Sequence, residues 1–353
     1  MSTLTPSQQA ALDRSDDLER RIAATPAHFR VLSGDRPTGS LHIGHYLGSI
    51  RNRVRLQDLG VHVTVLIADY QVITDRDGGG DLHATVRAML ADYLAAGIDP
   101  DRSLIFTHAA VPELNELMLP FLSLVSAAEL QRNPTVRAET EATGRPPSGL
   151  MLTYPVHQAA DILFGRANLV PVGLDQLPHL ELTRVIARRF NERYGRLFAE
   201  PEPLLSRTPA VPGLDGRKMS KTHRNGIALS ASEDETARVI RSAPTDSIRE
   251  ITYDPVGRPA VARLIELMAA VTDIAPADIA ARVGISGAAG LKAQVTDAIN
   301  ETLRPVRRAR AEFAADEAYL DGVLRAGNAQ AREQAAATLR EVHAALGLRY
   351  VDV

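Results

Sequence analysis

The sequence predicts an α/β fold built on a parallel sheet and followed by an all-helical C-terminal region. Four short apolar segments, at 29–32, 61–69, 103–109 and 167–173, predict strands, and helical patterns separate them. Strands that alternate with helices form parallel sheets, whose ligands bind at the carboxyl ends of the strands. From about residue 232 onward helical periodicity dominates and strand signals are few.

The composition is that of a globular chain long enough for roughly two domains. The 353 residues carry 40 Lys and Arg against 43 Asp and Glu, a net charge of −3, and include no cysteine. The lack of thiols excludes disulfides, thiolate metal sites and cysteine nucleophiles. The longest charge-free apolar stretch, Leu117 to Ala128, is shorter than the ~20 residues that span a bilayer. The first residues lack the apolar core of a signal peptide, so we expect a cytoplasmic protein with no membrane segment.

The first predicted strand runs into a glycine-rich segment, SGDRPTGSLHIGHYLG at 33–48, and then into a helical pattern. A strand, a glycine loop and a helix in this order open a Rossmann-like nucleotide-binding unit. His42 and His45 share one face at the helix start, where free N–H groups and the helix dipole favour anions. Both imidazoles are therefore expected to contact nucleotide phosphates and to stabilise departing pyrophosphate. The alternatives are surface histidines or a zinc half-site, but zinc needs three or four ligands and no partner motif follows, so no protein-bound metal is predicted.

A second basic motif, KMSKT at 218–222, lies in the proline- and glycine-rich loop 207–226 that ends the α/β region. Two lysines three residues apart on a loop suit a clamp that closes on a transferring or departing phosphate. A solvated basic loop is the alternative, and it is the commoner case for this motif alone. The combination with the early HIGH segment favours a clamp formed by Lys218 and Lys221.

Further ordered segments extend these two signatures over nearly the whole chain from Phe29. They are TYPVHQAADIL at 153–163, VPVGLDQLPHLELTR at 170–184, RFNERYG at 189–195, SAPTDS at 242–247 and ETLRP at 301–305. With them the sequence resembles the class I aminoacyl-tRNA synthetases, and among these the tryptophanyl-tRNA synthetases. The resemblance implies activation of L-tryptophan with ATP, Mg²⁺ arriving on the ATP, and then esterification of the terminal ribose of tRNA(Trp). It also implies a homodimer formed through the α/β domain.

The same resemblance assigns residues to the two small substrates. The expected catalytic residues are His42, His45, Lys218 and Lys221. The expected ATP-binding residues are Arg36, Pro37, Thr38, Gly44, His45, Gly173, Leu174, Asp175, Lys218, Met219, Ser220, Lys221 and Thr222. The expected amino-acid-binding residues are Leu32, Gly34, Gln71, Thr135, Gln158, Asp161, Val170, Val172 and Gln176.

Asp161 is the residue expected to select tryptophan. The resemblance implies that its carboxylate accepts the indole N–H, and a buried acceptor discriminates strongly against rings that cannot donate there. The alternative is a helix residue that caps or pairs within the core, and the AADIL context favours the ligand role.

Specificity for tyrosine is the nearest alternative. Tyr154, Gln158 and Asp161 have the Y-x₃-Q-x₂-D spacing of archaeal and eukaryotic-type tyrosyl-tRNA synthetases. Those enzymes bind the phenol with a tyrosine two residues before the first motif glycine, where this chain has Leu32, which suits an indole.

Two further alternatives belong to other functional classes. They are a different H-x-G-H nucleotidyltransferase and a non-catalytic RNA-binding relative. The KMSKT loop and helical C-terminal region disfavour the first, and the intact signatures disfavour the second.

Some pocket positions depart from the family pattern. Bacterial relatives usually have QPSG at 36–39, MTQ at 133–135 and Met at 158, where this chain has RPTG, NPT and Gln158, and a family histidine is replaced by Gln71. We expect these changes to alter the affinity for tryptophan and for indole-like inhibitors, while the ATP chemistry is unaffected.

The chain is expected to have four parts: a polar N-terminal extension (1–28), a Rossmann-type catalytic domain with a helical insertion (29–206), the KMSKS loop (207–226) and a helical anticodon-binding domain (227–353). The arginines of RPVRRARA could contact tRNA phosphates; they are Arg304, Arg307, Arg308 and Arg310. A solvated face paired with Glu301 and Glu312 is an equal alternative. The apolar helices within 110–130 could contribute to the dimer contact or belong to the core.

Overall fold

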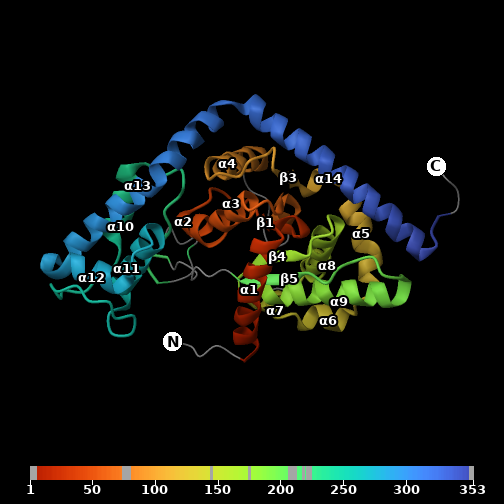
Figure 1. Cartoon of the computed structure of the whole chain (residues 1–353), viewed down its shortest axis with the longest axis horizontal. Coiled ribbons are helices and arrows are strands. Elements are labelled where there is room, and N and C mark those ends of the chain that lie inside the picture. The colour runs from red at the N-terminus through yellow and green to blue at the C-terminus, as the bar shows by residue number, and fades with distance from the viewer. Residues whose placement is uncertain are drawn as a thin grey trace.

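The structure, a computed structural model, describes residues 6–73, 81–143, 146–173, 176–205, 213–216, 219 and 225–349. At its centre lies a parallel sheet of five strands in the order β3-β2-β1-β4-β5 (Figure 1). The strands are β1 (Arg30–Asp35), β2 (His62–Ile67), β3 (Ser103–Thr107), β4 (Leu169–Val172) and β5 (Glu202–Leu205). The predicted parallel α/β sheet is therefore confirmed.

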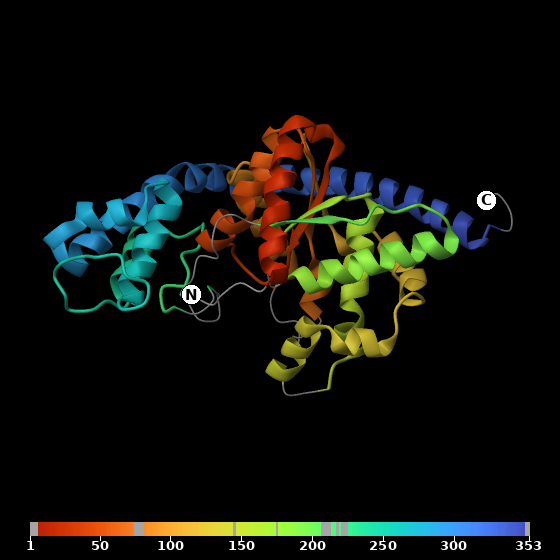
Figure 2. The same ribbon diagram turned by 60° about the horizontal axis from the view of Figure 1, so that its bottom comes forward.

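Helices cover both faces of this sheet and make up the C-terminal region. Those before and within the α/β part are α1 (Pro6–Ala24), α2 (Ile43–His45), α3 (Arg51–Asp58), α4 (Leu82–Ala95), α5 (Glu113–Leu122), α6 (Ala127–Arg132), α7 (Pro134–Thr143), α8 (Gly149–Phe164) and α9 (Leu177–Tyr194). Those of the C-terminal region are α10 (Glu233–Ser242), α11 (Pro259–Thr272), α12 (Pro276–Val283), α13 (Gly287–Ala315) and α14 (Glu317–Leu346). In Figure 2 the yellow helices α6 and α7 project from the side of the sheet that α8 and α9 cover.

The strand order reverses at β1, which is the central strand. Val31 pairs with Val63 of β2 on one side and with Leu169 of β4 on the other. In open α/β sheets the crevice at such a reversal, outside the carboxyl ends of the strands, is where ligands bind. The glycine-rich segment that follows β1 therefore begins at this crevice.

Successive residues of a strand face opposite sides of a sheet, so each side of β1 has its own core. Val31 lies in the core that contains residues of α2, α3, α4 and the helical C-terminal region. Leu32 lies in the second core, together with residues of α5, α8 and α9. The crevice at the end of β1 is thus held between two buried layers.

The two C-terminal helices return to the sheet. In Figure 1 they form an arch in which α13 packs on α4, and α14 crosses β3 and reaches α5. The approach of α14 to the edge strand β3 requires Gly327, because a Cβ there would lie 1.9 Å from the carbonyl oxygen of Ile105. Residues 317–346 therefore pack on the α/β part, although they follow the helical region in sequence. They also cover an edge strand that would otherwise be open to pairing.

Several predicted elements occur with shifted ends. The first strand continues to Asp35, and the strand predicted at 103–109 ends at Thr107 because a short 3₁₀ helix, η4 (His108–Ala110), follows it. The helical pattern predicted after the glycine-rich segment is divided into α2, a π-helical segment, η2 (Tyr46–Ile50), and α3. Such π segments insert an extra residue into a helical turn and leave no signature in the spacing of apolar residues.

The N-terminal extension forms the helix α1, which covers β5, a strand that the sequence did not predict. In the described residues α1 packs on β5, where the Ser15 hydroxyl accepts the Leu205 N–H at 3.0 Å and Arg21 forms an ion pair with Glu202 at 3.1 Å. β5 has four residues and includes Pro203, which is tolerated because the strand lies at the sheet edge. None of the described helices is long and apolar enough to cross a membrane.

Candidate active site

A cavity of about 160 Å³ lies at the carboxyl ends of β1 and β2, beside α8 and the start of α9. Its walls come from five separate parts of the chain. The lining residues are Leu32, Gly34, Asp35, Arg36, Leu66, Ala68, Gln71, Thr135, Tyr154, Gln158, Asp161, Gln176 and His179. Gly34 is required in this wall, since a Cβ there would lie 2.7 Å from the carbonyl oxygen of Leu66. The cavity occupies the crevice that the strand order marks as a ligand site.

One face of α8 supplies three polar side chains to this cavity. Tyr154, Gln158 and Asp161 are spaced by four and then three residues, so they point to the same side of the helix. The helix begins at Ser148, whose side chain accepts the Met151 N–H and fixes the start of the helix. Asp161 lies deepest of the three and is 2% exposed.

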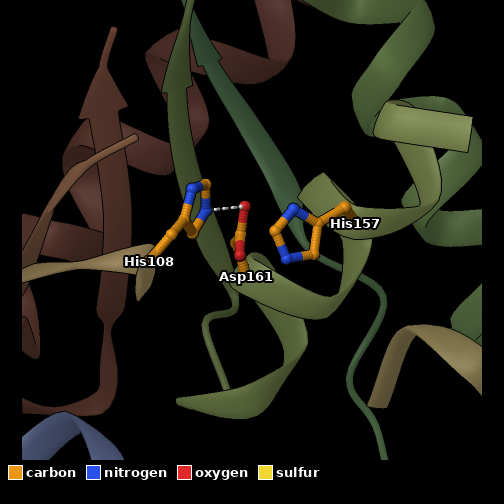
Figure 3. Close-up of side chains that lie close together, drawn as sticks. All are labelled: His108, His157 and Asp161. Carbon is orange, nitrogen blue, oxygen red and sulfur yellow. Dashed lines mark hydrogen bonds and ion pairs between the residues drawn. The ribbon is translucent and has the colours of Figure 1, made fainter. Parts of the chain in front are cut away.

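The carboxylate of Asp161 has two oxygens in different environments. Its Oδ2 lies 2.8 Å from Nε2 of His108, at the end of β3 (Figure 3). Its Oδ1 is buried and has no hydrogen-bond partner among the described residues. A buried carboxylate oxygen without a donor is unfavourable, so this atom is suited to accept a hydrogen bond from a ligand.

His108 lies between two carboxylates. Its Nδ1 is 3.9 Å from Oδ1 of Asp69, which follows β2 and also accepts the N–H of Ala109 at 3.1 Å. Burial acts to lower the pKa of His108, but the charges of Asp161 and Asp69 and the hydrogen bond to Asp161 outweigh it, so the pKa is raised. The neighbouring His157, with its ring 4.6 Å from that of His108, has its pKa lowered by burial.

His108, His157 and Asp161 also form a group that could hold a metal ion. Each is buried, and one ligand atom from each lies within 4.8 Å of the others. Two histidines and a carboxylate are ligands that divalent transition metals accept. The sequence-based expectation that no side chains hold a metal stays a prediction.

Tyr154 of α8 and His179 of α9 form a pair of ring side chains in the cavity wall. The hydroxyl of Tyr154 lies 3.0 Å from Nε2 of His179, which is 2% exposed. The guanidinium of Arg36 lies over the Tyr154 ring, 5.8 Å from its centre. These contacts fix the tyrosine ring at the side of the cavity that opens toward the glycine-rich segment.

The two signature histidines lie together at the start of α2, as predicted. Nδ1 of His45 accepts the backbone N–H of His42 at 3.2 Å, and the two ring centres are 3.8 Å apart. His42 is the residue before the helix. The backbone N–H groups of Ile43 and His45 already donate within the protein, to the carbonyls of Ile227 and His42. The groups that this turn offers to a phosphate are therefore chiefly the two imidazole rings.

The KMSKT segment meets the HIGH segment in space. The backbone N–H of Ile43 donates to Ile227 at 2.8 Å, which brings the chain after the loop to α2. Met219 is 6% exposed, and its sulfur lies 3.1 Å from the position of a Cβ on Gly44. The central residue of one signature therefore packs on the glycine of the other, and a Cβ at this glycine would require the His42 ring or the Met219 side chain to shift.

The profile of the family described as "tRNA synthetases class I (W and Y)" matches residues 25–304, most of the chain. The chain belongs to this family. It is a class I aminoacyl-tRNA synthetase, and neither another nucleotidyltransferase nor a non-catalytic RNA-binding protein is favoured.

Individual relatives of this synthetase agree over nearly the full length. A tryptophan–tRNA ligase of Treponema pallidum is 42% identical over 329 residues, which cover 91% of this chain and 97% of the relative. One of Streptococcus pyogenes is 41% identical over 337 residues, with coverage of 91% and 98%. The solved tryptophanyl-tRNA synthetase of Campylobacter jejuni with ADP and tryptophan has a TM-score of 0.79 and 30% identity, and the match covers 90% of this chain and all of that one.

Seven of the nine residues expected to bind the amino acid line the cavity of the synthetase. They are Leu32, Gly34, Gln71, Thr135, Gln158, Asp161 and Gln176. The other two do not line it: Val170 is buried in the core of α5, α8 and α9, and Val172 packs against that core. The spacing of the VPVG segment does not reveal which of its side chains point inward.

Of the expected ATP-binding residues, Gly44, His45 and Met219 lie where the two signatures meet, and the others divide into three groups. Arg36 lines the cavity, and Pro37 and Thr38 form the turn after it, in which the Thr38 N–H donates to the Arg36 carbonyl at 2.8 Å. Gly173 lies exposed at the end of β4. Six expected residues lie outside the described part of the chain: Leu174, Asp175, Lys218, Ser220, Lys221 and Thr222.

Sequence reasoning missed His108, Asp35 and His179 as site residues. His108 and Asp35 each stand at the carboxyl end of a strand, which is a general signal for a ligand-facing position. Asp35 forms an ion pair with Arg53 at 2.7 Å and accepts a hydrogen bond from the Tyr93 hydroxyl at 2.6 Å. His179 lies in the quoted LPHLELTR segment, but its contact with Tyr154 depends on the packing of α9 against α8.

The arginines of RPVRRARA do not form one common surface. Arg310 is turned inward and forms an ion pair with the buried Asp92 of α4 at 2.5 Å, and Arg307 contacts Asn300 and Thr236. Arg308 pairs with Glu312 at 3.4 Å, as the solvated-face alternative expects, and Arg304 pairs with Glu233 at 3.1 Å. Part of this cluster therefore joins α13 to its neighbours.

Proposed function

We propose that this synthetase is a tryptophan–tRNA ligase. It activates L-tryptophan with ATP to tryptophanyl-adenylate and pyrophosphate, and then transfers the tryptophanyl group to the 3′ end of tRNA(Trp). The names of its relatives at 41–42% identity support the assignment. A single observation carries it: a buried acceptor oxygen of Asp161 has no partner among the described residues, and Asp161 lines a cavity whose wall also includes Leu32, Leu66 and Ala68.

The indole ring has one hydrogen-bond donor, its N–H, and no acceptor. It therefore matches a cavity in which Asp161 presents an acceptor oxygen. Oδ1 of Asp161 accepts the indole N–H, while Leu32, Leu66 and Ala68 contact the carbon skeleton of the ring. A phenol hydroxyl both donates and accepts, and Leu32 offers it no second partner. A site built around a hydrogen bond rejects analogues that lack the matching group by large factors.

The nucleotide lies between the HIGH and KMSKT segments. A carboxylate oxygen of tryptophan attacks the α-phosphorus of ATP, the P–O bond to the β-phosphate breaks, and pyrophosphate leaves. His42, His45, Lys218 and Lys221 stabilise the charge on the phosphates, and Gly44 lets the adenosine approach the backbone. Mg²⁺ enters with the ATP as part of this substrate. In the second step the terminal ribose hydroxyl of tRNA attacks the acyl carbon and AMP leaves.

Partners and location follow from the same assignment. We place tRNA on the helical C-terminal region, where the exposed Arg304 and Arg308 can contact phosphates in a salt-dependent way. The enzyme forms a homodimer, and α5 is a candidate contact because it buries Leu114, Leu117 and Phe121 but leaves Leu119 71% exposed. It works in the cytoplasm with its tRNA.

Tryptophan-dependent exchange of pyrophosphate into ATP, measured with the wild type and with Asp161→Ala, tests the proposal. The wild type should support exchange with tryptophan and charge tRNA(Trp). The variant should lose exchange with tryptophan and keep the circular-dichroism spectrum of the wild type. Normal tryptophan activation by the variant would refute the role of Asp161, and charging of another tRNA by the wild type would refute the assignment.

A further inference from the structure

The recognition of tryptophan depends on which oxygen of Asp161 is available. A carboxylate on a helix can rotate about its terminal torsion, which has broad energy minima, so either oxygen could turn toward the cavity or away from it. In this structure the two oxygens are not equivalent, because only Oδ2 contacts His108. A residue outside the cavity wall therefore determines the orientation of a residue within it.

We propose that His108 is a positioning residue for the choice of amino acid: by holding Oδ2 of Asp161, it leaves Oδ1 to accept the indole N–H. The inference rests on the proposed function, since it concerns how the same cavity selects its substrate. His108 itself is 1% exposed and does not line the cavity, so it acts through Asp161 and does not touch the ligand.

The proton in this contact is on the histidine. An ionised carboxylate has only acceptor atoms, so the ring nitrogen that lies 2.8 Å from Oδ2 must carry the hydrogen. The raised pKa of His108, which the carboxylates of Asp161 and Asp69 cause, supports a ring that donates here. The backbone of His108 follows β3 directly, so the donor is fixed by the sheet and not by a free loop.

The same three side chains could instead hold a metal ion, and the distances favour the hydrogen bond. Two ligands of a tetrahedral zinc ion, each about 2.1 Å from the metal, stand about 3.4 Å apart. Nε2 of His108 and Oδ2 of Asp161 are only 2.8 Å apart, which is the length of a charge-assisted hydrogen bond. The buried Nε2 of His157 has no hydrogen-bond partner among the described residues, so His157 is a neighbour that does not hold Asp161.

The test compares two uncharged substitutions that differ in reach. In His108→Gln the amide nitrogen is as many bonds from the backbone as Nε2, so it can donate to Oδ2 of Asp161. In His108→Asn the amide nitrogen takes the place of Nδ1 and cannot reach that oxygen. The substrates are L-tryptophan and β-(3-benzothienyl)-L-alanine, in which a sulfur atom replaces the indole N–H. The measured quantity is the ratio of kcat/KM for these two amino acids in ATP–pyrophosphate exchange.

The wild type should prefer tryptophan strongly, and H108Q should keep this preference. H108N should lower the ratio by about 10- to 100-fold, which is the range for a buried polar group left without its partner. The loss should appear as a higher KM for tryptophan with a similar kcat, because the contact exists in both the bound and the transition state. The kcat/KM of H108N for the benzothienyl substrate should differ from that of the wild type by less than about threefold. His157→Gln, the matched control beside His108, should leave the ratio unchanged.

The remaining outcomes distinguish a failure of the proposed function from a failure of the positioning role of His108. A wild type that does not activate tryptophan would refute the proposed function, whereas an H108N enzyme with the wild-type ratio would refute only the positioning role. Should H108N fail to fold, as judged by thermal unfolding, H108S gives the same comparison because a serine hydroxyl also cannot reach Oδ2. Titration of the metal-free enzyme with Zn²⁺ tests whether His108, His157 and Asp161 bind a metal ion instead. Zinc binding that excludes tryptophan, and that H108N and H157Q both abolish, would assign the cluster to a metal and overturn the proposal.

Discussion

Arg53 of α3 and Asp35 at the end of β1 form a buried ion pair, with Nη1 2.7 Å from Oδ2 and side chains 2% and 18% exposed. The hydroxyl of Tyr93 donates to the same oxygen at 2.6 Å. Asp35 lines the cavity and is directly followed by the Arg36-Pro37-Thr38 turn. The pair therefore fastens the segment between the amino-acid cavity and the HIGH helix to α3 and α4.

Replacing one partner of this pair should destabilise the protein. Arg53→Met leaves a buried carboxylate without its cation, and such changes cost about 3–5 kcal/mol of unfolding free energy. Urea denaturation measures the loss. The double variant with Asp35→Asn should be less destabilised than the sum of the two single variants, and additive effects would contradict the coupling.

The same ion pair predicts that the free energy of unfolding depends on pH in the acid range. Burial acts to raise the pKa of Asp35, but the charges of Arg53 and His45 and the hydrogen bonds from Arg53 and Tyr93 lower it from 3.8 to about 2. The contribution, about 2 kcal/mol, is present above the unfolded pKa and is lost as the pH falls through the folded one. The stability difference between wild type and Asp35→Asn should thus be constant above about pH 5 and decrease between about pH 4 and pH 2. A difference that does not change with pH in this interval would disprove the assignment.

Gly44→Ala should impair catalysis without unfolding the enzyme. A Cβ at this position lies 3.0 Å from the His42 ring and 3.1 Å from the Met219 sulfur, so one of these must move. We expect kcat of pyrophosphate exchange to decrease by at least about tenfold, since small displacements of catalytic groups are costly. Gly48→Ala on the same helical segment is the control, because no atom lies within 4 Å of its Cβ position. Equal effects of the two substitutions would contradict the contact between the signatures.

Two glycines of α14 should respond in opposite directions. Gly327→Ala places a Cβ 1.9 Å from the Ile105 carbonyl oxygen and forces α14 away from β3. The expected loss of stability is at least about 2 kcal/mol, in the range for overpacking. Gly322→Ala, with an open Cβ position, should be neutral or stabilise the helix by up to about 1 kcal/mol. Thermal and urea unfolding of the two variants measure this, and a harmless Gly327→Ala would show that α14 does not pack on the sheet in solution.

The lysines of the KMSKT motif should affect the rate more than the affinity for tryptophan. The chain contains only three lysines against 37 arginines, and Lys218 and Lys221 are two of them. Their replacement by alanine should lower kcat by about 100-fold, because their charges act on the departing pyrophosphate, and KM for tryptophan should stay within about twofold. The third lysine, Lys292, bonds to the Arg241 carbonyl in the helical region and provides the control. A higher KM with an unchanged kcat would refute the clamp.

Much of the fold and part of the site can be predicted from local sequence. The spacing of Tyr154, Gln158 and Asp161 is enough to place these three side chains on one face of a helix. Contacts made by sheet register and helix packing cannot be predicted in this way. His108 meets Asp161 only because β3 ends beside α8, and Arg310 points inward only because α13 packs on α4. The short strand β5 was missed because its sequence, EPLL, places only two apolar residues after Glu202 and Pro203, too short a run to indicate a strand.

ATP–pyrophosphate exchange with each of the twenty amino acids tests the central claim most directly. The account predicts rapid exchange with L-tryptophan, at a kcat/KM at least about 10⁴-fold above that for tyrosine or phenylalanine. Equal exchange with tryptophan and tyrosine, or exchange with tyrosine alone, would contradict it.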